Sequence, residues 1–414
     1  MPWRPDHLLC GVTYMPAEVG PWLWHEFDVA RTERDFTRIR AAGFGTVRVH
    51  LAWDAFMPTP RQVDRYRLRD LETLLGIAAA TSLQVVPVLF AQSFGDCVLL
   101  PRWAVSRDRA RPGVRAISGG IVEPGGPRDI WDDPLMLEAQ SRWLDDILRA
   151  FANHPAVLAW DLGHDPATTC RPARIAHVES WAALMGGRVR STQDPCWLTL
   201  GWRDVLSARG MRVSAVAPHV DAVGMLVHPQ RLRLDGPPLD PLRTLFVARL
   251  AQRLAVPDAA AEPPPLVLVD GIVAEPQSTF PPVQAAAPVR SVAPAPVEEA
   301  IRYAGELLER APEAGVVAAI ASSWSDLGPR PLESPPYDRH PWLAACGLAE
   351  PDGTVKPHGE VWSSVARRDV DPGKPAPWPP EAFDAAQWYE NLPDAANDVF
   401  ARFRAEFGIS GQGS

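Results

Sequence analysis

The sequence predicts an α/β fold: a single-domain (β/α)8 TIM barrel with long βα loops and a C-terminal helical extension. Three observations support this prediction. Eight short apolar runs alternate with helical patterns in one continuous series. The 414 residues are enough for one such barrel. The segment GVTYMPAEVG at the first run is not a glycine-rich phosphate turn, so a doubly wound open sheet is the weaker alternative.

The apolar runs are the predicted strands, because their alternation with helical patterns is typical of successive βα units. A long loop rich in Gly, Pro and Arg is expected after the third run, over 91–133, and proline-rich segments around the seventh run predict further extended surface loops within 256–299. The predicted strands are 7–14, 46–53, 84–90, 157–163, 197–202, 220–228, 265–272 and 316–324.

Helical spacing of apolar residues fills the intervals between these runs. Residues 30–43 place Phe36, Ile39 and Ala42 on one face, and Asp240 followed by Pro241 is an N-cap with proline in the first turn. The other predicted helices cover 68–80, 135–151, about 172–186 and 297–315. A further amphipathic pattern at 384–407 is expected to pack on the outside of the barrel. We therefore assign residues 1–365 to the barrel and 366–414 to a C-terminal extension.

Composition excludes several function classes. The net charge is −9 and no run is rich in Lys or Arg, so we expect neither nucleic acid nor an anionic membrane as a partner. Five widely spaced cysteines without a CxxC pair predict neither a disulfide framework nor a zinc site, and we expect no metal and no cofactor. The N-terminus lacks a signal-peptide pattern and no apolar stretch reaches about 18 residues, which predicts a cytoplasmic protein.

Active sites of such barrels lie at the C-terminal ends of the strands. Carboxylates and tryptophans dominate the residues that follow the predicted strands. Flat aromatic rings suit the C–H faces of sugars, and two carboxylates across a barrel suit cleavage of a glycosidic bond. We therefore predict Asp165 and Asp270 as catalytic residues and a carbohydrate as the ligand. The predicted substrate-binding residues are Arg48, Trp53, Ser93, His164, Trp202, His228 and Trp324.

Each of these residues also has a structural interpretation. The tryptophans could fill the barrel mouth, since Trp is mostly buried in any fold. Asp165 precedes Pro166, and Asp270 precedes Gly271, so each could open a turn. Arg48 could form an ion pair inside the barrel, and the two histidines could complete a hydrogen-bond network. The joint placement on the fourth and seventh strands favours the functional interpretation.

Segments spread over roughly residues 8–360 are similar to one known group of proteins. They are GVTYMPAEVGPWLWHEFD, RDFTRIRAAGFGTVRVHLAWDAFMP, HPAVLAWDLGHDP, WLTLGW, PLVLVDGI and PPYDRHPWLAACGLAEPDGTVKP. Taken in order, they resemble cellulase-like retaining glycoside hydrolases of clan A, close to glycoside hydrolase family 5 and the bacterial β-galactosidase-type barrels. The resemblance implies a TIM barrel.

The family's chemical positions carry other residues in this chain. Its acid/base is the Glu of an Asn-Glu-Pro motif after the fourth strand, which falls on His164, Asp165 and Pro166. Its nucleophile is a Glu at the end of the seventh strand, which falls on Asp270. Other polar positions of the family fall on or near Ser93, Leu226, His228 and Leu343, whereas Arg48 and Trp324 match the family.

The resemblance implies hydrolysis of β-glycosidic bonds in oligo- or polysaccharides, with an Asp/Asp pair replacing Glu/Glu. Each Asp is one methylene shorter than Glu. On an unchanged backbone the carboxyl groups would therefore separate from the about 5–5.5 Å of a retaining pair toward the about 6.5–9.5 Å of an inverting pair. If the protein is active, we expect its hydrolysis to be weak or inverting.

Three functions remain open on the sequence. The first is a divergent glycoside hydrolase with Asp165 as general acid and Asp270 as base or nucleophile. The second is a catalytically inactive pseudo-glycosidase that binds a carbohydrate or a protein partner. The third is a barrel enzyme repurposed for other chemistry by His164, Asp165 and His228.

Overall fold

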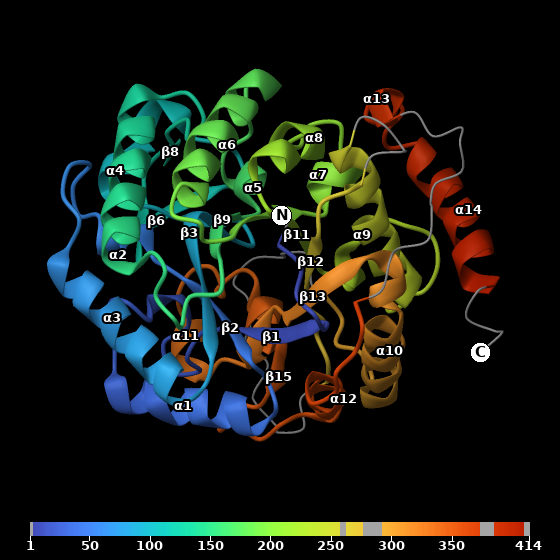
Figure 1. Cartoon of the computed structure of the whole chain (residues 1–414). Helices are drawn as coiled ribbons and strands as arrows, with labels where there is room; N and C mark the ends of the chain where they lie inside the picture. Colours follow the sequence, from blue (N-terminus) through green and yellow to red (C-terminus); the bar gives the residue numbers. More distant parts are fainter. Residues whose placement is uncertain (1–2, 257–261, 276–291, 373–384, 410–414) are drawn as a thin grey trace.

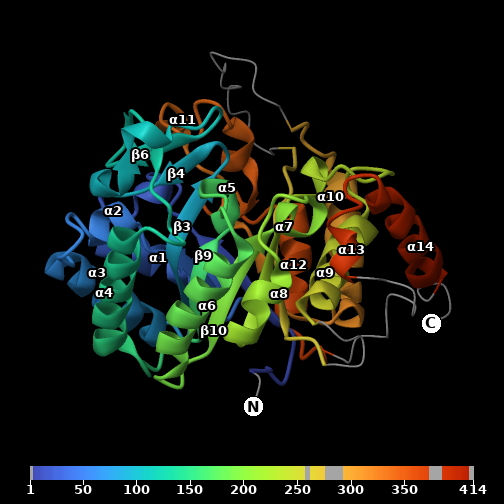
Figure 2. The ribbon, with the colours of Figure 1, turned by 90° about the horizontal axis from the view of Figure 1, so that it is seen from above.

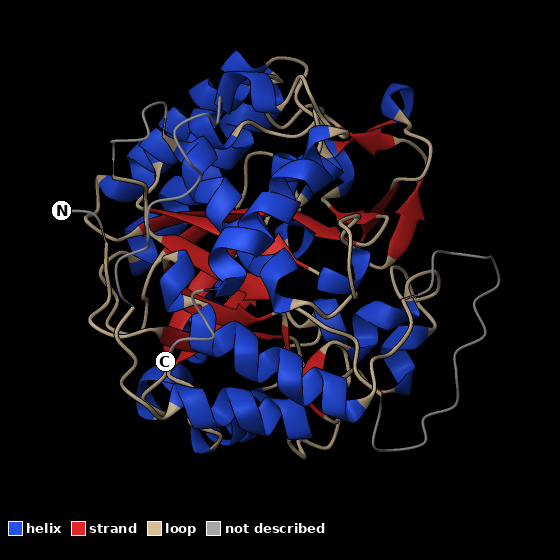
Figure 3. Ribbon diagram, turned by 90° about the vertical axis from the view of Figure 1, so that its right-hand side faces the viewer, coloured by secondary structure: helices blue, strands red, loops and turns tan. Residues whose placement is uncertain are grey.

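The computed structural model describes residues 3–256, 262–275, 292–372 and 385–409. Eight parallel strands close into a barrel in the order β2-β1-β13-β12-β11-β10-β9-β3, and pairing of β2 with β3 completes the ring. Figure 3 shows the strands at the centre with helices around them. The barrel strands are β1 (Leu9–Tyr14), β2 (Thr46–His50), β3 (Gln84–Phe94), β9 (Trp160–His164), β10 (Cys196–Gly201), β11 (Ala222–Val227), β12 (Leu266–Asp270) and β13 (Val316–Ala321).

Helices follow these strands in the expected order, which confirms the predicted (β/α)8 barrel (Figure 1). Four of them begin at an aspartate whose side chain accepts a backbone N–H of the first turn, and the predicted cap at Asp240 is one of these. The main helices are α1 (Val29–Ala41), α3 (Arg65–Ala80), α4 (Pro134–Phe151), α6 (Ile175–Arg190), α8 (Val213–Val216), α9 (Pro241–Ala255), α10 (Val297–Arg310) and α12 (Pro357–Ala366).

Side chains of each strand alternate between the barrel interior and the helix layer. On β12, Val267 and Val269 pack inside the barrel with side chains of the other strands. Leu266 and Leu268 belong instead to the large core cluster that includes the helices. Asp270 shares the parity of Leu266 and Leu268, so its side chain leaves the strand on the helix side.

The segment predicted as a loop over 91–133 contains additional strands. β3 runs on to Phe94 and pairs with β4 (Cys97–Leu99), and the sheet continues through β6 (Arg115–Ser118) to β7 (Ile121–Glu123). Gly95 lies between β3 and β4 with φ of +62°, a conformation that glycine adopts without steric cost. The tight reversal at this glycine makes a hairpin where the sequence predicted only a loop.

The C-terminal pattern at 384–407 forms two helices instead of the single predicted one: α13 (Ala385–Trp388) and α14 (Ala395–Ile409). Pro393 lies between them and cannot donate the backbone hydrogen bond that a continuous helix needs. α14 lies beside α9 in Figures 1 and 2. The ring of Phe246 on α9 is 5.2 Å from that of Phe400 and 5.6 Å from that of Phe403. The boundary between barrel and extension at residue 365 stays a prediction.

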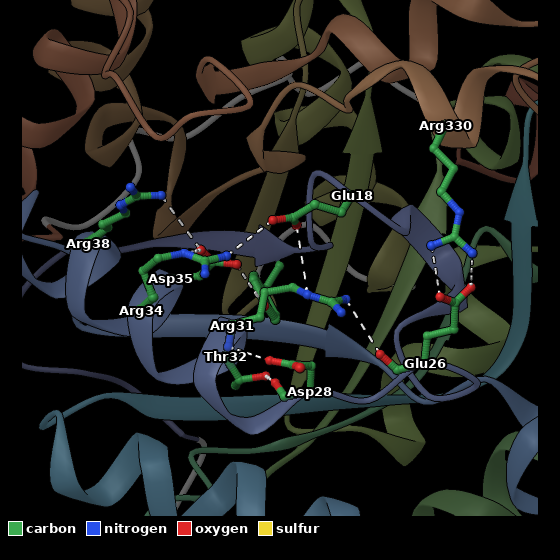
Figure 4. A network of polar contacts seen from close by, with 10 residues as sticks. Glu18, Glu26, Asp28, Arg31, Thr32, Arg34, Asp35, Arg38 and Arg330 are labelled. Atoms are coloured by element: carbon green, nitrogen blue, oxygen red, sulfur yellow. Dashed lines mark hydrogen bonds and ion pairs between the residues drawn. The ribbon is translucent and has the colours of Figure 1, made fainter.

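Charged residues at and around α1 form an ion-pair network on the surface (Figure 4). Arg34 lies 3.1 Å from Glu18, and Arg330 donates to both carboxylate oxygens of Glu26 at 2.8 and 2.9 Å. These groups are largely exposed to solvent, and such pairs contribute little net stability. We therefore interpret this network as a solvated surface that does not bear on the site.

Candidate functional site at the C-terminal end of the barrel

Arg48 and Asp161 form a fully buried ion pair inside the barrel. Arg48 Nε and Nη2 donate to Asp161 Oδ2 at 3.0 and 2.8 Å, and neither side chain is exposed. Thr199 Oγ1 donates to the same oxygen at 2.6 Å. The arginine is thus held below the mouth by a carboxylate and a hydroxyl. This placement favours the structural interpretation of Arg48, as an interior ion-pair residue.

Two histidines lie above this ion pair. Arg48 Nη1 is 3.3 Å from His50 Nε2 and 3.2 Å from His164 Nδ1. Because arginine only donates, these ring nitrogens accept and both imidazoles are neutral. Burial lowers the pKa of both histidines well below its usual value, and the charge of Arg48 lowers each further. His164 is therefore part of a hydrogen-bond network at the barrel mouth.

His228 directly follows β11 at the mouth of the barrel. Its Nδ1 is 3.1 Å from the carbonyl oxygen of Gly271, and its ring contacts the ring of Trp342 edge-on at 5.1 Å. Burial, followed by the charge of Arg231, lowers the pKa of His228 to about 4. A neutral imidazole donating to a carbonyl positions the β11 and β12 ends against each other.

Asp165 directly follows β9 and is the N-cap of the short helix α5 (Pro166–Thr169), with φ of +50°. Its Oδ2 accepts a hydrogen bond from Thr168 Oγ1 at 2.7 Å, while its buried Oδ1 has no hydrogen-bond partner among the described residues. Ser93 Oγ donates to the backbone oxygen of Asp165 at 3.2 Å. Burial raises the pKa of the Asp165 carboxyl. The group is positioned and desolvated, as a proton donor would be.

The neighbouring carboxylate of Asp165 is Asp204, which sequence analysis missed. Asp204 lies on α7 (Arg203–Leu206) and accepts the backbone N–H groups of Gly201 at 3.0 Å and Met211 at 2.7 Å. Burial, then the charge of Asp165, raises the pKa of Asp204 to about 8. The signal was present in Arg203-Asp204, which immediately follows the fifth predicted strand.

Gly201 provides the space that Asp165 occupies. A Cβ atom at residue 201 would collide with the Asp165 carboxylate. This glycine ends β10, so the Asp165 carboxylate packs against the end of the strand from which Asp204 follows on α7.

Asp270 faces the helix layer. Tyr303 on α10 donates to Asp270 Oδ1 at 2.9 Å, and the same hydroxyl lies 2.9 Å from Thr244 Oγ1 on α9. Burial raises the pKa of Asp270 to about 7, opposed by the hydrogen bond from Tyr303. At the next residue, Gly271, a side chain would instead point toward Ser322 and His228. The structure therefore brings Asp165 together with Asp204 and places Asp270 against a tyrosine outside the barrel.

The three predicted tryptophans occupy two kinds of environment. Trp53 is 1% exposed and stacks on Trp143 with ring centres 5.6 Å apart, and Trp324 is 2% exposed near Phe44. Trp202 is partly exposed, with the guanidinium of Arg203 4.5 Å from its ring centre. The first two placements favour the core interpretation, whereas Trp202 is available to a ligand.

Two neighbouring hollows lie over α5 and α7, the short helices that follow β9 and β10. The larger measures about 560 Å³ and is lined by Trp202 and Gln230 among others. The smaller measures about 400 Å³ and is lined by Asp165, Thr168 and Asp204 among others. Volumes of this size are typical of small-molecule sites.

The C-terminal segment contributes to this end of the barrel. Trp388 Nε1 donates to the carbonyl oxygen of Val205 at 2.7 Å, and the Tyr389 hydroxyl donates to that of Asp204 at 3.1 Å. Pro393 and Ala396 line the larger hollow. The predicted extension therefore forms part of the wall beside α7.

No family model matches the chain, and no curated protein does. Solved structures do resemble it. An exo-β-1,4-mannosidase from Opitutaceae bacterium strain TAV5 is 20% identical with a TM-score of 0.67 over 88% of this chain, which spans 60% of that protein. A GH5_18 protein from Streptomyces cattleya in complex with Manβ1-4GlcNAc is 18% identical with a TM-score of 0.72, over 98% of this chain and 92% of that one.

A β-galactosidase from the psychrophilic Marinomonas ef1 also aligns, with 14% identity and a TM-score of 0.59 over 87% of this chain and 59% of that one. Identities this low establish the fold alone. The resemblance to the barrels of clan A glycoside hydrolases is therefore confirmed in the architecture.

Two further features bear on the predicted ligands. In the described ranges, no group of three or more His, Cys, Asp or Glu side chains is arranged to hold a metal ion. None of the helices searched in that part of the chain is both long and apolar enough to cross a membrane. The cytoplasmic location stays a prediction.

Proposed function

We propose that this protein is a glycosidase-fold binding protein: it holds a saccharide at the C-terminal end of its barrel and does not cleave glycosidic bonds with the Asp165/Asp270 pair. The observation that carries the proposal is the orientation of Asp270. Its carboxyl group accepts a hydrogen bond from Tyr303 in the helix layer, whereas Asp165 neighbours Asp204. Glycoside hydrolysis by two carboxylates requires both to flank the same bond.

Saccharide binding is supported by two observations. The similar structures include a mannosidase and a protein in complex with Manβ1-4GlcNAc. In this chain, the partly exposed ring of Trp202 and the carboxyl groups of Asp165 and Asp204 line neighbouring hollows at the strand ends. An aromatic face and hydrogen-bonding carboxyls are the groups that sugar rings and hydroxyls contact.

A divergent hydrolase that uses Asp165 as its general acid is the competing proposal. Burial raises the pKa of Asp165, which favours the protonated form that a general acid needs. The partner base would then have to be a group other than Asp270. Asp204 is the carboxylate that interacts electrostatically with Asp165, but it already accepts hydrogen bonds from two backbone N–H groups.

The test is a panel of aryl β-glycosides assayed with the full chain and with Asp165→Ala, Asp270→Ala and Asp270→Asn. We expect no hydrolysis above the uncatalysed rate in any of them. Hydrolysis that disappears in both alanine variants, with the folded state verified by circular dichroism, would overturn the proposal. Hydrolysis lost only in Asp165→Ala would support the divergent hydrolase instead.

A second measurement addresses binding directly. Titration of mannose and Manβ1-4GlcNAc into the protein, followed by protein NMR or calorimetry, is expected to show saturable binding that weakens in Trp202→Ala. Trp53→Phe is the matched control, because Trp53 is buried against Trp143 and offers no face to a ligand. The absence of saturable binding to any saccharide, charged ones included, would contradict the proposed binding function.

A further inference from the structure

Arginine side chains converge on the two hollows above α5 and α7. The larger hollow and the smaller one share Arg171, Arg203 and Ser207 in their walls. The chain as a whole carries a net charge of −9, so this local cluster of positive side chains is opposite in sign to the net charge. The arginines that line one or both hollows are Arg111, Arg171, Arg203, Arg209, Arg231 and Arg233. We call this site the arginine hollow.

Three arginines of the arginine hollow lack a close carboxylate partner among the described residues. Within the described part of the chain, Arg171, Arg203 and Arg209 form no ion pair within 4.0 Å. Burial lowers the pKa of Arg171, and repulsion by Arg111, Arg209 and Arg203 lowers it further. Mutual repulsion of this kind is relieved when an anion binds between the guanidinium groups.

The two carboxylates in the lining of the arginine hollow, Asp165 and Asp204, do not cancel this charge. Burial raises the pKa of both, that of Asp204 to about 8. These two carboxyl groups are also fewer than the six arginines that line the hollow. The hollow is left with an excess of positive charge beside hydrogen-bonding carboxyl groups.

We propose that the arginine hollow binds the oxyanion of a phosphorylated or carboxylated saccharide. The saccharide part of this inference rests on the function proposed above. Guanidinium groups offer paired N–H donors that match phosphate and carboxylate oxygens. Asp165 Oδ1, which is buried and has no hydrogen-bond partner in the described ranges, lies in the same wall and can accept a hydrogen bond from a sugar hydroxyl.

The size and the surroundings of the site favour a small ligand. Volumes of about 560 and 400 Å³ accommodate a mono- or disaccharide with its charged group. A long polyanion such as nucleic acid would meet the repulsion of a chain with net charge −9 beyond the hollow. The partly exposed ring of Trp202 provides an apolar surface beside the arginines.

The experiment is an equilibrium titration of the full chain at low ionic strength with four probes: mannose, mannose 6-phosphate, mannuronate and inorganic phosphate. We expect at least one of the two charged sugars to bind about tenfold or more tightly than mannose. Whichever of these two binds more tightly identifies phosphate or carboxylate as the preferred oxyanion. Binding is also expected to weaken as salt is added, because the attraction is electrostatic.

Variants locate the binding site. Arg171→Gln/Arg203→Gln is expected to remove most of the preference for the charged sugar, a loss of about tenfold or more. Arg142→Gln removes the same type of charge from the exposed face of α4, where Arg142 pairs with Glu138, and is expected to bind the probe as the parent does. Thermal unfolding of each variant verifies that the fold is intact.

The outcomes separate the two proposals. Equal affinity for mannose and both charged sugars, unchanged by Arg171→Gln/Arg203→Gln, would overturn the anion inference and leave saccharide binding in place. Inorganic phosphate bound as tightly as mannose 6-phosphate would overturn the saccharide part, and no affinity for any anion would overturn the inference entirely. Hydrolysis dependent on Asp165 and Asp270 would contradict the proposed function without changing this titration.

Discussion

Tyr303 donates a hydrogen bond of 2.9 Å to Asp270 from the helix layer outside the barrel. The interaction joins α10 to the end of β12 and engages the carboxyl group that sequence comparison places at a nucleophile position. It also gives Asp270 a structural role, because a buried carboxyl group is stable only with a hydrogen-bond partner or a proton.

The first prediction concerns Asp270→Asn and the pH dependence of stability. Burial raises the pKa of Asp270 to about 7, above the about 3.9 of an unfolded Asp. Between these values the folded protein retains a proton that the unfolded chain releases, so the group's contribution is complete at low pH and is lost as pH rises toward 7. The neutral amide can still accept from Tyr303. We expect the variant to lose less stability than the parent between pH 4 and 8.

Urea unfolding at a series of pH values measures this difference. At about 1.4 kcal/mol per pKa unit, the free energy of unfolding of the parent should fall by up to a few kcal/mol more than that of the variant as the pH rises above 7. Comparison with the parent removes the contribution of other titrating groups such as Asp204, which both proteins share. Parallel pH curves for parent and variant would contradict the prediction.

The second prediction concerns Gly201 and the space it leaves for Asp165. Gly201→Ala places a Cβ against the Asp165 carboxylate, and we expect a loss of about 1–3 kcal/mol in the free energy of unfolding. Asp165→Ala/Gly201→Ala removes the group that collides, so the cost of the alanine at 201 should fall in this background. The double-mutant cycle reports the coupling directly. Additive effects would show that the two residues do not meet.

The third prediction concerns the ion pair inside the barrel. Arg48→Met leaves Asp161 as a buried carboxylate without its counter-charge, which costs about 3–5 kcal/mol in comparable cases. Arg142→Met removes one member of an exposed i,i+4 pair on α4 and should cost about 0.3–0.5 kcal/mol. Denaturant unfolding of both variants measures the contrast. Similar losses in the two variants would argue against a buried role for Arg48.

The fourth prediction separates the tryptophans. Trp53→Ala deletes a buried ring stacked on Trp143 and should cost about 3–5 kcal/mol. Trp202→Ala deletes a partly exposed ring with one cation–π contact and should cost about 1 kcal/mol. Thermal or urea unfolding distinguishes them. A larger loss in Trp202→Ala than in Trp53→Ala would reverse our assignment of core and ligand-accessible rings.

The barrel could be predicted from the sequence because its signal is repeated. Each of the eight apolar runs overlaps an observed strand, and capping residues such as Asp240 and Pro241 mark helix starts locally. The hairpin after Phe94 and the break at Pro393 were missed because single residues decide them: Gly95 permits the reversal, and Pro393 interrupts a helical pattern. Such local breaks are hidden when the surrounding periodicity is strong.

The sequence by itself determined the barrel, the order of its elements and the set of polar residues that follow the strands. Only the tertiary structure decided which way those residues face. Asp270 lies one residue from Gly271 along the chain, yet alternation on β12 turns the carboxyl group toward Tyr303 and leaves the glycine facing His228. Asp204 and the arginines of the hollow come together from loops after different strands. Their convergence depends on closure of the barrel, which local patterns along the chain do not encode.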